Sequence, residues 1–447
     1  MINYRSRFHW LALLLGTACS LPAWSLDMLQ AYDTALTQDA TVRAAKAAAD
    51  AGRERLPQTR AQLLPNLSFS GARYDNNLNR SQPNNLGVPT TFKDTYISDN
   101  ETLTLRQPLF RKQLWDAYEQ AKFIVDDVNA VLERELKNLG VRVSAAYLEA
   151  LLAKDQLDLV LSQKAFMTAA LDMARKALAA GSGTRTDVDE AQAKLDMTQA
   201  REVEARQFLD FTRRQMEVLI SRPVDKLEPL NVARMPLLPP APDRLEEWIR
   251  RAEEANPEII SQQAKVEAAR LEVKKAEGGH YPTVDAVAQY VHSSSENVNT
   301  PNSSYTNKSI GVQVVVPLYA GGYVNSTVRQ ALAQQQQAEE VLEATRRELG
   351  VRVHKEFRGV TEGVVRVKAL EQAVRSAEQL LISSRKSLQA GSRTLTDVLN
   401  AEQQRQATLR DLAQARYQYV AARIRLLALA GAGAREGIEE TNAWLGL

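Results

Sequence analysis

The chain has 447 residues, of which 25% are charged, and its 56 Lys and Arg residues nearly balance 54 Asp and Glu residues. This balance argues against a nucleic acid as the partner, and the single cysteine, Cys19, excludes a disulfide framework. Mean hydropathy is −0.34, and beyond the N-terminus no apolar stretch approaches the ~20 residues of a membrane helix. Any contact with a membrane must therefore come from β-strands.

The N-terminal residues 1–25 have the features of a secretory signal peptide. Arg5 and Arg7 precede a short apolar run, and Ala23-Trp24-Ser25 supplies small residues for cleavage. Gly16 stands where a lipobox needs leucine ahead of Cys19, which disfavours a lipid anchor. We therefore expect export without lipidation, and an exported chain that begins at residue 26.

Residues 26–63 are rich in Ala, Glu, Lys and Arg, and they predict a helix. From residue 64 the pattern changes to period two, which predicts a β-hairpin over about 64–108 with a polar loop at 75–100. Strands of this length with one apolar face are typical of membrane barrels, and aromatic residues near their ends, such as Tyr74 and Phe110, are typical of the interfacial girdle.

A very long helix is predicted over residues 111–180, which contain no proline and one glycine. At ~1.5 Å per residue it would be roughly 105 Å long. Apolar residues spaced three and four apart over 132–160 form a seam for packing against partner helices. A glycine-centred turn at 180–185 then reverses the chain into a return helix over 185–220.

The stretch 221–242 contains six prolines and predicts a connector without helix. Beyond it the chain repeats the same plan over residues 243–433. The elements expected there are a helix over 243–279, a hairpin at about 281–317 with a polar loop at 293–308, a long helix over 323–390 and a return helix over 394–430. Residues 434–447 are expected to be a C-terminal tail.

The two halves are copies of one unit. Leu139-Gly-Val-Arg-Val143 recurs as Leu349-Gly-Val-Arg-Val353, at an offset of 210 residues. The first half, residues 26–220, therefore forms one structural repeat and residues 243–433 the second.

One chain has four candidate membrane strands, whereas the smallest closed membrane barrels have about eight. Because an open edge leaves unpaired backbone groups in lipid, the barrel must be shared between chains. A periplasmic coiled-coil adaptor or scaffold is the alternative, but it does not explain the hairpins.

The duplicated Pro-Leu-aromatic junctions at Pro108 and Pro317, and the duplicated turns at Gly181 and Gly391, resemble the TolC family of outer-membrane factors over essentially the whole exported chain. The resemblance implies a mainly α fold with a pair of β-hairpins and an internal two-fold repeat. It also implies a homotrimer in which three chains share a 12-stranded β-barrel, continued by a long periplasmic α-helical barrel.

The resemblance places the functional residues at the helical turns. Asp397 matches an acidic ring at the periplasmic constriction, where Asn400 replaces a second acid of many members. Thr186, Asp187 and Arg393 match a closed-state latch. Asp187 and Asp397 are also suitable as helix caps, because Asp near the first turn favours the helix dipole.

The resemblance implies an outer-membrane channel that works with a periplasmic adaptor and an inner-membrane ABC transporter in type I secretion of a polypeptide. The alternative is small-molecule or drug efflux, in which the transporter would be of the RND class. Outer-membrane lipid is the other expected partner. We expect no enzyme activity, cofactor or metal, since the histidines at 280, 292 and 354 are scattered and no metal or phosphate-binding motif occurs.

Overall fold

The computed structural model describes residues 25–83, 85–295 and 303–446. The predicted signal peptide, apart from Ser25, lies outside these residues. The chain divides into two compact units. One, called here the sheet unit, comprises residues 45–133 and 257–347, and the other, called the hairpin unit, comprises residues up to 44 with 134–256 and 348–447.

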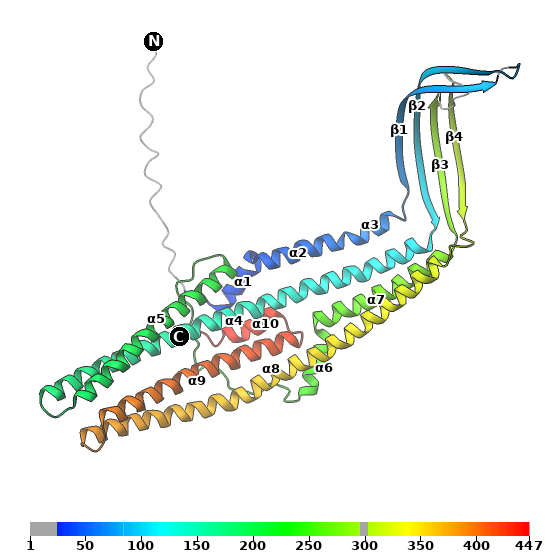
Figure 1. Ribbon diagram of the computed structural model, residues 1–447. Coiled ribbons are helices and arrows are strands. Elements are labelled where there is room, and N and C mark those ends of the chain that lie inside the picture. Colours follow the sequence, from blue (N-terminus) through cyan, green and yellow to red (C-terminus); the bar gives the residue numbers. More distant parts are fainter. Residues whose placement is uncertain (1–24, 84, 296–302, 447) are drawn as a thin grey trace, which may run out of the picture. The chain divides into compact units, whose positions relative to one another are not determined.

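The sheet unit contains a four-stranded antiparallel sheet in the order β1-β2-β3-β4 (Figure 1). Its strands are β1 (Asn66–Pro83), β2 (Pro89–Phe110), β3 (Thr283–Ser294) and β4 (Ser304–Val315). Each predicted hairpin is thus present, and β2 joins the two hairpins by pairing with β3.

The predicted polar loop at 75–100 is wrong. Pairing continues up to Pro83↔Pro89, so most of this segment is strand. Asn and Thr side chains there are hydrogen-bonded across the strands, as when Asn76 Nδ2 donates to Ser98 Oγ at 2.8 Å. The predicted second loop, 293–308, is also too long, because β4 already begins at Ser304; residues 296–302 of this loop lie outside the described residues.

Two helices of about equal length dominate the chain. Helix α4 (Lys112–Ala179) has 68 residues and α8 (Tyr323–Gln389) has 67, and both contribute residues to the two units. They occupy the segments where long helices are predicted. No helix in the described part of the chain is both long enough and apolar enough to cross a membrane.

The segments that precede the hairpins are helical, as expected, and each is divided into shorter helices. Residues 26–63 form α1 (Met28–Gln38), α2 (Ala40–Arg53) and α3 (Arg55–Ala61). Asp39 separates α1 from α2, since its carboxylate accepts a hydrogen bond from the Val42 backbone N–H at 2.9 Å and so caps α2.

In the second half, α6 (Leu245–Ala255) and α7 (Pro257–Glu277) are separated at Asn256, and a short 3-10 turn, η1 (Gly278–His280), follows. Pro257 lacks the amide hydrogen that a continuous helix would need and stands at the first position of α7, where it is tolerated.

The hairpin unit contains two helical hairpins (Figure 1). The end of α4 turns into α5 (Arg185–Ile220), and the end of α8 turns into α9 (Leu395–Leu429). The predicted seam on α4 is buried at Leu139, Val143 and Ala153. Near the turns, Met167 and Leu171 of α4 share a core with Leu399 of α9, so apolar packing joins the hairpins.

The proline-rich connector, residues 221–242, has neither helix nor a named strand and is held by buried tyrosines. The Tyr147 hydroxyl is a hydrogen-bond donor to the backbone carbonyl oxygens of Leu26 and Glu228, at 2.9 and 3.0 Å. Tyr419 receives a hydrogen bond from the Leu238 amide at 3.2 Å. The expected C-terminal tail instead forms α10 (Ala434–Asn442), which packs on α1 and α9.

Candidate functional site

One face of the four-stranded sheet is apolar. The register aligns Leu67, Leu105, Ala288 and Ile310 in one row across all four strands. Ile310 is 87% exposed in the single chain. Phe69, Leu103, Val312 and Val314 lie on the same face. Toward the strand loops this face also carries charged residues, at Arg73, Asp99, Glu101 and Lys308. The exposed apolar rows nearer the helices mark contact with lipid or another protein.

The opposite face is polar. The next row aligns Ser68, Thr104, Gln289 and Ser309. Because successive side chains of a strand point to opposite faces, the alternating sequence and the register together separate the two surfaces. The sheet can therefore face lipid on one side and water on the other.

Both edges of this sheet are open among the described residues. The order β1-β2-β3-β4 leaves β1 and β4 each paired on one side only. Unpaired backbone amides and carbonyls need a partner wherever water is absent. The sheet is therefore incomplete in one chain.

A charged cluster lies where the sheet meets the helices, and sequence reasoning missed it. Asp285 of β3 receives hydrogen bonds from Arg106 Nε at 3.1 Å and from Arg111 Nε at 2.8 Å. The Asp285 side chain is only 4% exposed. A lone acid in an otherwise uncharged strand, with arginines at the end of the neighbouring strand, is the signal that could have found it.

Pro108 and Pro317, predicted as strand-to-helix junctions, differ in setting. Pro108 lies in β2 opposite Asp285, where the register shifts before Phe110. A proline at such an irregularity is tolerated because it has no amide hydrogen to donate. Pro317 lies beyond the end of β4, in the segment that leads to α8.

The turns at the tips of the helical hairpins are alike in both halves. Gly181 and Gly391 have φ of 76° and 74°, a conformation that glycine adopts without strain. A capping box follows each turn: Thr184 with Asp187 begins α5, and Thr394 with Asp397 begins α9. The repeated turn sequence is thus explained by helix reversal and capping.

Asp397 is engaged in its own cap. Its carboxylate accepts hydrogen bonds from the Thr394 backbone N–H at 2.9 Å and from the Thr394 hydroxyl at 2.8 Å. The backbone hydrogen bond above all, then the hydroxyl, and also the nearby Arg393, lower the pKa of Asp397. This carboxylate is therefore charged throughout the physiological pH range.

The residues predicted to form a latch are not joined to one another within the chain. The Asp187 carboxylate accepts hydrogen bonds from Thr184, and Arg393 donates to the Ser384 hydroxyl at 3.0 Å. Thr186 is exposed on the first turn of α5.

A different set of contacts links α5 to α9. Lys194 donates to the Asn400 side-chain oxygen at 2.6 Å, and the Thr396 hydroxyl donates to Glu190 at 2.5 Å. Glu190 and Asn400 occupy equivalent positions, 210 residues apart, in the two repeats. Asn400 therefore has a structural partner that the sequence did not indicate.

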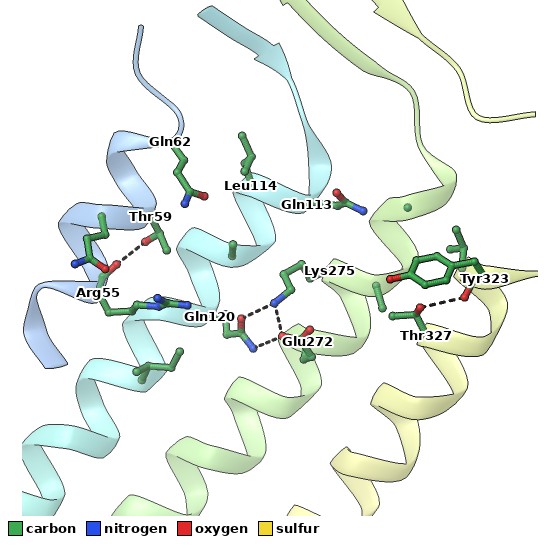
Figure 2. A pocket seen from close by; sticks show the side chains of 16 residues that line it. Arg55, Thr59, Gln62, Gln113, Leu114, Gln120, Glu272, Lys275, Tyr323 and Thr327 are labelled. Atoms are coloured by element: carbon green, nitrogen blue, oxygen red, sulfur yellow. Dashed lines mark hydrogen bonds and ion pairs between the residues drawn. The ribbon is translucent and has the colours of Figure 1, made fainter. Parts of the chain in front are cut away.

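A polar pocket of about 430 Å³ lies in the sheet unit among α3, α4, α7 and α8 (Figure 2). There Gln120 donates to Glu272 at 2.8 Å and accepts from Lys275 at 3.3 Å. Burial alone would raise the pKa of Glu272, but the hydrogen bonds from Lys275 and Gln120 lower it on balance. The side chains of Gln120, Glu272 and Lys275 thus supply one another's hydrogen-bond partners and join α4 to α7.

No group of three or more His, Cys, Asp or Glu residues in the described ranges is arranged to hold a metal ion.

Comparison with known proteins gives consistent matches. The profile of the outer membrane efflux protein family matches residues 31–220 and 248–432. The chain is 32% identical over 443 residues to Proteases secretion protein PrtF of Dickeya chrysanthemi, covering 97% of this chain and 95% of that protein. It is 33% identical over 418 residues to Alkaline protease secretion protein AprF of Pseudomonas aeruginosa, covering 92% and 85%.

Solved structures share the fold. The structure of CusC superimposes with a TM-score of 0.79 at 17% identity, covering 92% of this chain and 93% of that one. The structure of the outer membrane protein VceC from Vibrio cholerae gives 0.75 at 18% identity, covering 91% and 96%.

The capping boxes predict how fast backbone amides exchange in the first turns of α5 and α9. Thr394→Ala should accelerate amide hydrogen exchange in the first turn of α9 roughly five-fold, because it removes a side-chain acceptor for an otherwise unpaired amide. Thr184→Ala should do the same in α5 and leave α9 unchanged. Exchange followed by mass spectrometry checks both, and equal protection in wild type and variant would contradict the cap assignment.

The same tip should respond to acid. Since hydrogen bonding lowers the folded pKa of Asp397, its stabilising effect is fully present above the ordinary carboxyl pKa of about 3.9 and is lost as the pH falls through the lowered value. Faster exchange of Asp397→Asn relative to wild type should therefore be clear at neutral pH and disappear in strong acid.

Proposed function

The chain belongs to the outer membrane efflux protein family, and from this we propose that it is the outer-membrane channel of a type I system that secretes a protein. The sheet, with one mainly apolar and one polar face, is the observation that supports a channel. Its apolar row can face lipid while its polar row lines a water-filled path. The family is one of outer membrane channels and not of enzymes.

The proposed assembly is a homotrimer. Four strands with two open edges cannot close alone, and β4 of one copy can pair with β1 of the next. Three copies would supply 12 strands, a number within the range of known membrane barrels. The helices α4, α5, α8 and α9 of the three copies would then form the periplasmic tunnel.

Full-length similarity to two protease-secretion proteins supports a polypeptide as the passenger. A periplasmic adaptor and an inner-membrane ABC transporter would complete the export path. Small-molecule efflux with an RND transporter is the second candidate. The family description and the 28% identity to Outer membrane efflux protein BepC of Brucella suis support this second function.

We place the periplasmic gate at the helical tips. Three Asp397 carboxylates converging on a narrow lumen would attract cations and repel anions. Asn400 would add no charge to that ring. Arg393 of one copy would contact Thr186 and Asp187 of another, and Gly181 and Gly391 would allow the tight turns that bring these residues together.

The sheet faces can be tested with adjacent residues of β4. Ile310→Lys should abolish or strongly reduce the heat-modifiable oligomer in outer-membrane fractions, because a lysine facing mid-bilayer lipid costs about 2–4 kcal/mol. Ser309→Lys introduces the same charge one residue away on the polar face and should assemble normally. Loss of assembly in Ser309→Lys but not in Ile310→Lys would invert the assignment.

The latch can be tested by conductance. Asp187→Ala combined with Arg393→Ala should raise single-channel conductance in planar bilayers, since the closed tips lose a contact. Arg185→Ala with Asp189→Ala removes an exposed pair within α5 at the same tip and should change little. Thr184→Ala, which removes the cap but keeps the Asp187 carboxylate, separates capping from latching. Unchanged conductance in the double latch variant would refute the latch.

The passenger can be identified in a deletion strain. We expect loss of at least one secreted protein from the culture medium, restored by the wild-type gene, with unchanged sensitivity to small toxic compounds. The secreted proteins and the inhibitory concentrations should be measured in parallel. Increased drug sensitivity with an intact set of secreted proteins would instead favour efflux.

A further inference from the structure

Where all four strands are paired, the polar face of the sheet carries charge at one level only; Arg80 and Asp94 lie on this face farther out, in the β1–β2 ribbon. From the Asn66 row to the Ala72 row the described side chains on this face are Ser, Thr, Asn, Gln, Tyr or small and apolar, apart from Arg106. Asp285 lies on the same face two residues nearer the helices than Val287, the partner of Arg106, and Arg111 reaches Asp285 from the end of β2. Charge is thus concentrated where the sheet meets the helices.

This cluster is not neutral. Asp285 is the one carboxylate between two guanidinium groups, since Arg106 Nη2 lies 3.0 Å from Asp285 Oδ2 and Arg111 Nε lies 2.8 Å from Oδ1. The nearby Lys112 is paired with Asp116 and adds no net charge. Each chain therefore holds one uncompensated positive charge at this level.

The excess charge is accessible on the Arg106 side. Arg106 is 48% exposed, whereas Asp285 is 4% exposed and Arg111 is 30% exposed. An arginine has five N–H donors in a planar fork, so Arg106 can bind Asp285 and still offer donors to a second carboxylate.

We propose that Arg106, Arg111 and Asp285 form a cationic collar. The collar binds acidic segments of a polypeptide as the polypeptide passes from the helical part of the channel into the part lined by the sheet. The collar rests on the proposed channel, in which three copies bring three net positive charges around one path. Because the polar face of the four-stranded part is otherwise uncharged, the nearby walls do not cancel the field of the collar, and their low dielectric focuses it along the path. Binding by exposed arginines is weak and reversible, which suits transit.

Peptide block of the reconstituted channel tests the collar. A short oligoaspartate peptide added from the side of the strand loops should block the wild-type current reversibly at low salt, and oligolysine of equal length should not. Arg106→Gln leaves Asp285 paired with Arg111 and removes the net charge, so block should weaken roughly ten-fold, and high salt should weaken block of the wild type in the same direction.

Matched variants separate charge from folding. Arg73→Gln removes an arginine of β1 whose side chain lies on the opposite face of the sheet, and block should be unchanged. Arg106→Lys keeps the charge and should retain most of the block. All variants should show the heat-modifiable oligomer and clear single-channel steps.

The outcomes are distinct. Absence of channel steps in the wild type would refute the proposed function. Clear steps with equal oligoaspartate block in wild type and Arg106→Gln, or block by oligolysine only, would overturn the collar while leaving the channel intact.

Discussion

Backbone amides and carbonyls that enter a bilayer must be hydrogen-bonded within protein, and the rest of this molecule depends on that constraint. The four strands meet it internally but leave β1 and β4 with one unpaired side each. The chain therefore cannot complete its own sheet. Oligomerisation in the proposed trimer follows from hydrogen-bond geometry, and the apolar row through Leu105 and Ile310 adds the condition that the completed surface faces lipid.

At the helical tips the chain must reverse direction, and both halves use the same turn to do so. Each tip reverses a helix through a glycine of positive φ and restarts it with a Thr–Asp capping box. The carboxylates that family resemblance assigns to gating thus already stabilise helix ends. The proposed gate would combine charge with rigidity, because Thr394 already fixes Asp397 within its own chain.

Periodicity was sufficient for the long helices and for the existence of both hairpins, because tens of residues share one pattern and errors at single positions average out. It failed where polar residues form strands: Asn76 and its neighbours were predicted as loop, yet they pair across the ribbon. The Asp285 cluster and the Lys194–Asn400 contact join residues about two hundred positions apart. Only the register of β2 with β3, and of α5 with α9, brings them together.

The two hairpins of the sheet are of unequal length, although they belong to two copies of one repeated unit. Pairing of β2 with β3 ends at Asp99↔Ser294, while β1 and β2 remain paired to Pro83↔Pro89. Among the described residues, the outer part of this ribbon therefore belongs to the first repeat alone. In the proposed trimer the six helical hairpins would be approximately equivalent, whereas the outer ribbon would have only three-fold symmetry. The two copies of the repeat thus differ in the length of their strands, while both keep the same glycine turn and Thr–Asp capping box at the tips.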